Sequence, residues 1–157
     1  MLGEAAPLRP IAVVRLRARE QSTRVLALVD SGSERCLAAP GVAREIGVNL
    51  DSATEVKLGI GGAPRRVRFA DVQLELFLGS PGDDSPPIAS WTAPVGFLGD
   101  WEPAWPVLLG EKGFFDQFTV TMHRSARAFV VEPWEAFDQR FGVMIEIADK
   151  TQPRFHQ

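Results

Sequence analysis

The sequence of 157 residues contains one cysteine and no tyrosine, and it has no long apolar run. A single cysteine allows neither an internal disulfide nor a cysteine-based zinc site, so we predict that Cys36 is a small core residue. No stretch reaches the roughly 20 apolar residues that cross a bilayer, and the first residues lack the apolar centre of a signal peptide. We therefore expect a cytoplasmic protein that does not contact membranes.

The charges show no excess of either sign, because 17 basic residues face 20 acidic residues and the formal net charge is −3. Such a balance lacks the basic footprint of a nucleic-acid-binding protein, so no nucleic-acid partner is expected. Arginine clusters at 15–19 and 65–68 alternate with apolar residues, which is typical of the solvated faces of strands. His123 and His156 have no metal-ligand spacing, so we expect neither a metal nor another cofactor.

Apolar residues make up 45% of the chain, enough for one globular domain that spans residues 1–157. Period-two patterns predict strands at 11–18, 23–29, 55–60, 65–69, 71–78, 91–98, 107–109, 119–122 and 128–131. Short helices are predicted at 40–46, at 114–118 and around Trp134, Phe137 and Phe141, which share one helical face. We expect a core at about 10–132 and a C-terminal extension at 133–157.

The most informative segment is an apolar strand that ends in Asp30-Ser31-Gly32-Ser33. Such a turn presents one carboxylate at a strand end, with hydroxyls and amides beside it. Two further segments follow in order: the glycine-rich hairpin tip Gly59-Ile60-Gly61-Gly62 and the strand end Leu108-Leu109-Gly110. Taken singly, the first segment is more often an ordinary turn than an active site, the second is only a hairpin turn, and the third is only a core strand that ends in a bend.

In this order, the three segments resemble the retropepsin-like aspartic proteases, and residues 109–118 resemble the bacterial single-domain members in particular. The resemblance covers roughly residues 10–132. It implies a mainly β, acid-protease β-barrel with short helices and one Asp-Ser-Gly lobe per chain. It also implies roles for the three segments: Asp30 as the catalytic residue, Ser31, Gly32 and Ser33 as its supporting turn, Gly59, Ile60, Gly61 and Gly62 as a flap, and Leu108, Leu109 and Gly110 as structural support.

Peptide hydrolysis by carboxylates needs two of them, one ionised to activate water and one protonated to polarise the carbonyl. This chain has one Asp-Ser-Gly turn, so the pair requires a symmetric homodimer with two Asp30 side chains at its axis. Ser31 of each subunit is then expected to hydrogen-bond across the axis. We predict a homodimeric aspartic endopeptidase that binds an extended protein or peptide substrate beneath its flaps, with Leu28, Ile60 and Leu108 lining apolar subsites.

The sequence departs from the retroviral pattern next to the two motifs. Retroviral members pair an arginine after the second motif with an aspartate after the catalytic turn, whereas this chain has Glu111 and Glu34 at those places. Arg35 or Lys112 is expected to supply the cation instead. Two alternatives remain open: a non-catalytic peptide-binding or assembly module on the same fold, and an adaptor that recognises a partner through the Pro/Trp-rich segment 79–106.

Overall fold

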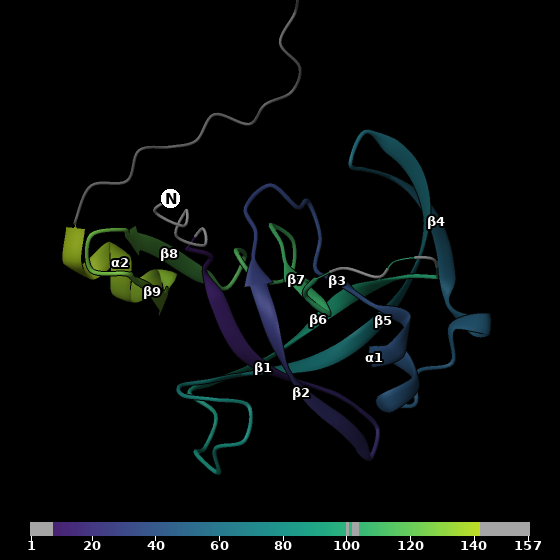
Figure 1. The fold of residues 1–157 in the computed structure, drawn as a ribbon, viewed down its shortest axis with the longest axis horizontal. Coiled ribbons are helices and arrows are strands. Elements are labelled where there is room, and N and C mark those ends of the chain that lie inside the picture. Colours follow the sequence, from purple (N-terminus) through teal and green to yellow (C-terminus); the bar gives the residue numbers. More distant parts are fainter. Residues whose placement is uncertain (1–7, 100, 102–103, 142–157) are drawn as a thin grey trace, which may run out of the picture.

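The computed structural model describes residues 8–99, 101 and 104–141, and most of them form a β-barrel (Figure 1). Six strands close the barrel by pairing in a ring: β1 (Ile11–Ala18), β2 (Gln21–Val29), β7 (Val107–Leu109), β3 (Leu37–Ala38), β6 (Ala89–Leu98) and β5 (Ala63–Phe77), which pairs again with β1. A seventh strand, β4 (Thr54–Ile60), pairs with β5 outside the ring. The mainly β barrel with short helices that the sequence predicted is therefore confirmed.

Strand β5 holds the barrel and the hairpin together, because its first half pairs with β4 and its last residues pair with β1. The sequence predicted two separate strands here, and this prediction was wrong. The buried side chain at odd-numbered Val67 is followed by buried side chains at the even-numbered positions from Val72 onward, and this change of face suggested that the strand ends between them. The strand in fact continues, and it passes from a small second core with Leu37 and Leu98 into the main barrel core.

The main core fills the barrel with apolar side chains from every strand of the ring, among them Val14, Ala27, Ala38, Leu74, Phe97 and Leu109. Helix α1 (Pro40–Glu45) packs against β2 and β6 and buries Val42 and Ala43 in the main core. It begins at Pro40 and is followed by Gly47 in a left-handed conformation, as the sequence predicted. A short 3-10 turn, η1 (Leu50–Ser52), then leads into β4.

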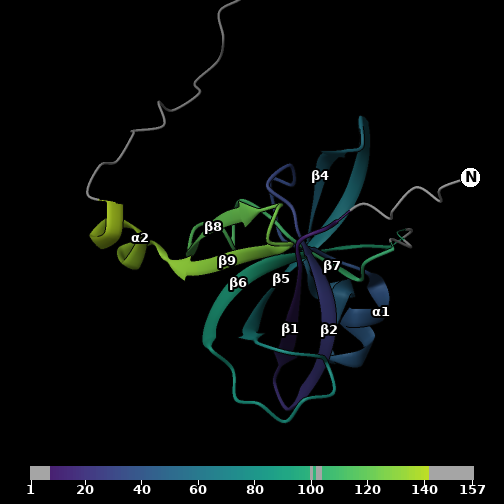
Figure 2. The same cartoon turned by 60° about the vertical axis from the view of Figure 1, so that its left-hand side comes forward.

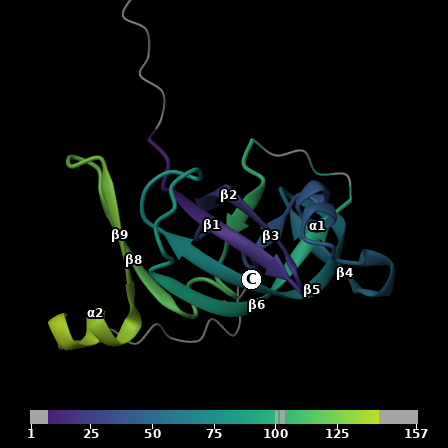
Figure 3. The same cartoon turned by 90° about the horizontal axis from the view of Figure 1, so that it is seen from below.

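A separate hairpin of β8 (Phe118–His123) and β9 (Ala128–Pro133) stands beside the barrel, followed by helix α2 (Trp134–Phe141), as Figures 2 and 3 show. The hairpin and α2 match the predicted elements, whereas residues 142–157 lie outside the described part. The helix predicted at 114–118 is absent, and consecutive turns replace it. Two separate helix-type bonds occur there, from the Phe114 amide to the Gly110 carbonyl and from the Phe118 amide to the Phe114 carbonyl, and they do not join into a helix. None of the described helices is long and apolar enough to cross a membrane.

Candidate functional site

The Asp30 turn follows β2 at the open end of the barrel. Its backbone is fixed by two hydrogen bonds: the Asp30 amide donates to the Leu109 carbonyl at 3.0 Å, and the Ser33 amide donates to the Asp30 carbonyl at 3.1 Å. The Gly32 amide donates to Oδ1 of Asp30 at 3.0 Å, so the carboxylate is held over its own turn. Its second oxygen accepts no hydrogen bond from the described residues, and it is left to bind water or a ligand.

Gly110 lets the end of β7 pack directly against the Asp30 turn. A Cβ at this position would stand 2.6 Å from the Ser33 carbonyl oxygen and even nearer to the Arg35 carbonyl oxygen. The close approach allows the Glu111 amide to donate to Ser33 at 2.8 Å and the Lys112 amide to donate to Glu34 at 2.9 Å. The segment after β7 therefore braces the whole turn through main-chain hydrogen bonds.

Glu34 carries the ion pairs of this turn. Its carboxylate lies 3.5 Å from Nε of Arg35 and 3.7 Å from Nζ of Lys112, so both of the cations that the sequence offered lie beside Glu34. All three side chains reach solvent, and surface pairs of this kind contribute at most about 1 kcal/mol each. The main-chain bonds therefore fix the turn more firmly than the ion pairs do.

The β4–β5 hairpin tip lies opposite the Asp30 turn. Ile60 pairs with Ala63, so Gly61 and Gly62 form a two-residue loop, and their φ angles of 60° and 79° are those of a type I′ turn. An ideal Cβ on either glycine would meet no atom within 4 Å, so nothing packs against the loop tip in the directions of these two Cβ positions. A lid that bends over a ligand needs such an unpacked tip.

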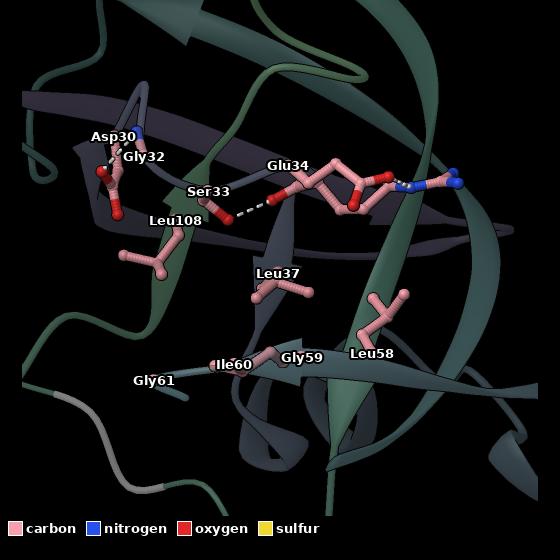
Figure 4. Close-up of a pocket in the computed structure, with 11 residues that line it drawn as sticks. Asp30, Gly32, Ser33, Glu34, Leu37, Leu58, Gly59, Ile60, Gly61 and Leu108 are labelled. Atoms are coloured by element: carbon pink, nitrogen blue, oxygen red, sulfur yellow. Dashed lines mark hydrogen bonds and ion pairs between the residues drawn. The ribbon is translucent and has the colours of Figure 1, made fainter. Parts of the chain in front are cut away.

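A pocket of about 180 Å³ lies between the turn and the hairpin tip (Figure 4). Asp30, Gly32 and Ser33 form one wall, the hairpin residues Gly59, Ile60 and Gly61 form the opposite wall, and Leu108 lies between them. The lining residues belong to the turn after β2, to β4 with its hairpin loop, and to β7. These segments are far apart in sequence, and strand pairing in the seven-stranded sheet brings them together. The result is a mixed pocket: aliphatic side chains lie beside the carboxylate of Asp30, and the charged residues Glu34 and Arg35 also line it.

Most of the predicted site residues line this pocket, and the rest support it. Ser31 is exposed at the tip of the turn, Gly62 completes the hairpin loop, and Leu109 and Gly110 lie behind the turn. Leu28 does not line the pocket, because β7 stands between β2 and the strands next to the hairpin.

The sequence analysis missed two apolar residues of the pocket, Leu37 and Leu58. Leu58 has the same parity as Ile60 along β4, and this alternation could have identified it. Leu37 lies on the two-residue strand β3, which has no period to read.

Cys36 lies behind the site against Gly113, fully buried as predicted. Burial raises the pKa of its thiol to about 11, so the sulfur stays protonated and is not a nucleophile at neutral pH. Within the described part of the chain, no group of three His, Cys, Asp or Glu side chains could hold a metal ion.

No family model matches this chain, and no curated protein matches it. Among solved structures, it is similar to the retroviral protease-like domain of Ddi1 from Leishmania major. The two are 11% identical over 78% of this chain and 89% of that chain, with a TM-score of 0.44.

Proposed function

We propose that the chain is a homodimeric aspartic endopeptidase in which Asp30 of each subunit supplies one of two catalytic carboxylates. The observation that carries the proposal is the pocket that Asp30 shares with the β4–β5 hairpin tip. The same order of turn, glycine-rich hairpin and bracing strand is the one by which the sequence resembles the retropepsin-like family. The proposal is supported by the position of Asp30, which lines the same pocket as the hairpin residues Gly59, Ile60 and Gly61.

The chemistry requires a second chain. One carboxylate must be ionised to take a proton from water, while the other is protonated and polarises the scissile carbonyl. Two adjacent carboxyls share a proton because like charges in contact disfavour double ionisation. The ionised Asp30 takes a proton from water, whose oxygen attacks the carbonyl carbon, while the protonated Asp30 gives its proton to the carbonyl oxygen, so that a gem-diol forms. The first Asp30 then gives its proton to the leaving amine nitrogen as the C–N bond breaks. A hydroxyl proton of the diol returns to the second Asp30, which leaves a carboxylic acid, an amine and the original pair. The exposed position of Ser31 leaves its hydroxyl accessible to a partner turn.

Substrate would lie extended beneath the hairpin and bond to its backbone as an added strand. Ile60, Leu58 and Leu108 give this cleft an apolar lining, which favours substrates with apolar side chains next to the scissile bond. No metal ion or other cofactor takes part in the proposed reaction.

The test is cleavage of an unfolded protein substrate by wild type and by Asp30→Asn, followed on gels from about pH 4 to 8. Asn is nearly isosteric but cannot ionise, so cleavage should be lost while folding and assembly persist. A matched control is Asp84→Asn, because Asp84 is exposed in the loop before β6 and far from the pocket. Undiminished cleavage by Asp30→Asn refutes the proposal.

The alternative function is a peptide-binding or assembly module that does not cut. It is favoured by one observation: a single chain already forms a pocket with aliphatic side chains in its walls, yet contributes a single Asp-Ser-Gly turn to it. A wild type that binds unfolded peptides without cleaving them, and that stays monomeric in sedimentation, would establish this function in place of the protease.

A further inference from the structure

A second concave surface lies between the β8–β9 hairpin and the start of β1, away from the Asp30 pocket. It consists of two cavities of about 260 and 240 Å³, and both are lined by Phe129 of β9. We call the two together the hairpin groove. None of its lining residues lines the Asp30 pocket, so the groove is a separate site.

One end of the hairpin groove is cationic. Arg9, Arg124 and Arg127 line it together with His123, and no lining residue is acidic. Four described arginines outside the groove do lie against carboxylates, namely Arg15, Arg35, Arg66 and Arg68, with Arg15 at 3.1 Å from Glu75. Among the described residues, no carboxylate forms an ion pair with the three arginines of the groove. This end is therefore suited to a negatively charged ligand.

The other end of the groove is apolar. Ile11, Val13 and Val131 form its floor, and its rim includes Leu78 and Ile88, which are 67% and 51% exposed. Large aliphatic side chains at such exposure gain stability when a ligand covers them, by roughly 25 cal/mol for each Å² removed from water. A ligand that fits the whole groove is apolar at one end and anionic at the other.

The backbone beside the groove favours a peptide over other ligands of this chemistry. Strands β8 and β9 pair with each other alone, so within the described residues each has one outer edge with no neighbouring strand (Figure 3). Unpaired strand edges accept an extended peptide through main-chain hydrogen bonds, while nearby pockets take alternate side chains. The hairpin offers both features on one surface.

We propose that the hairpin groove binds an extended peptide segment that joins the β8–β9 sheet. Its apolar residues lie in the cavity near Leu78 and Ile88, and acidic residues lie among Arg9, Arg124 and Arg127. The site is independent of hydrolysis at Asp30, since it serves a binding-only module equally well.

The test uses the full chain and a fluorescein-labelled peptide of alternating valine and threonine that ends in glutamates, with binding followed by anisotropy. A peptide that ends in lysines is the matched ligand control. Arg9→Gln combined with Arg124→Gln should weaken binding of the acidic peptide about fivefold to tenfold, because two solvent-exposed charge pairs, each of modest strength, are lost together. The control variant, Arg19→Gln with Arg44→Gln, removes the same charge away from the groove and should bind normally.

Two further measurements examine the apolar end and the strand edge. Leu78→Ser with Ile88→Ser should also weaken binding, and the folded core should tolerate it because both side chains are exposed. Hydrogen exchange of the amides on β8 or β9 should slow when the peptide is bound. Equal affinity for the lysine peptide, no effect of either double variant, or unchanged exchange in both strands overturns the proposal.

Other occupants of the groove give distinct results that also overturn it. If the acidic peptide does not bind but the chain sediments with anionic phospholipid vesicles through the same arginines, the occupant is a membrane. If the chain self-associates without peptide and Leu78→Ser with Ile88→Ser reduces its mass in sedimentation, the occupant is a second copy.

Discussion

Replacing Gly110 by alanine should destabilise the protein more than any other single added methyl group near the site. The new Cβ would stand 2.6 Å from the Ser33 carbonyl oxygen, about 0.4 Å inside the 3.0 Å that real Cβ atoms keep, and closer still to the Arg35 carbonyl oxygen. Both contacts are with main-chain atoms, which cannot rotate away as a side chain can. The turn and the segment after β7 must therefore separate.

The expected loss follows from the contacts that this separation strains. Overpacking of a well-packed region costs about 1–3 kcal/mol. Moving the strands apart also weakens the bonds from Glu111 to Ser33 and from Lys112 to Glu34, each worth about 1 kcal/mol. We expect a loss of about 2–4 kcal/mol in the free energy of unfolding. For a chain of this size, this corresponds to a fall in Tm of about 5–15 °C.

Urea denaturation with constant m-value measures this loss, and thermal unfolding provides a second measurement. Gly59→Ala is the matched control, because a Cβ there would meet nothing within 4 Å. It should change the free energy of unfolding by less than about 0.5 kcal/mol. A denaturation midpoint of Gly110→Ala equal to that of Gly59→Ala would refute the packing of β7 against the Asp30 turn.

Four further predictions follow from the pKa of Cys36, the hairpin loop, the turn charges and the single carboxylate. Between about pH 9 and 11 the Cys36 thiol ionises in the unfolded chain but stays protonated in the folded one, so the free energy of unfolding should fall by roughly 2–3 kcal/mol over that range. Urea denaturation at several pH values measures this fall, and Cys36→Ala should abolish it. The double variant Gly61→Val with Gly62→Val should lower peptide turnover far more than it lowers Tm, because the strain of valine at positive φ stays within the unpacked hairpin tip. Normal turnover of this variant would show that the hairpin tip does not act as a lid. Glu34→Gln should reduce stability by less than about 1 kcal/mol, and added salt should shrink the difference. Specific activity should fall on dilution into the monomer range of sedimentation, and activity that stays constant there would contradict a shared pair of carboxylates.

The local patterns of the sequence were sufficient to predict the elements around the site. The apolar run before Asp30 predicted a strand, the Gly61-Gly62 pair predicted a hairpin loop, and Pro40 with Gly47 bounded a helix. Each signal acts over a few residues, through alternation, positive φ or a missing amide, so it survives in any tertiary setting. The structure contains all three features.

The tertiary structure decided what these local signals could not. Pairing of β5 with both β4 and β1 made one strand where the pattern suggested two, because the buried face changes as the strand passes between two cores. The burial of Phe114 and Phe118 around Trp91 replaced a predicted helix with turns. Leu37 reached the pocket because β3 lies between β7 and β6, a neighbourhood set by long-range pairing and not by its own sequence. The residue types of the site were therefore readable along the chain, whereas their convergence depended on barrel closure, which joins segments separated by tens of residues.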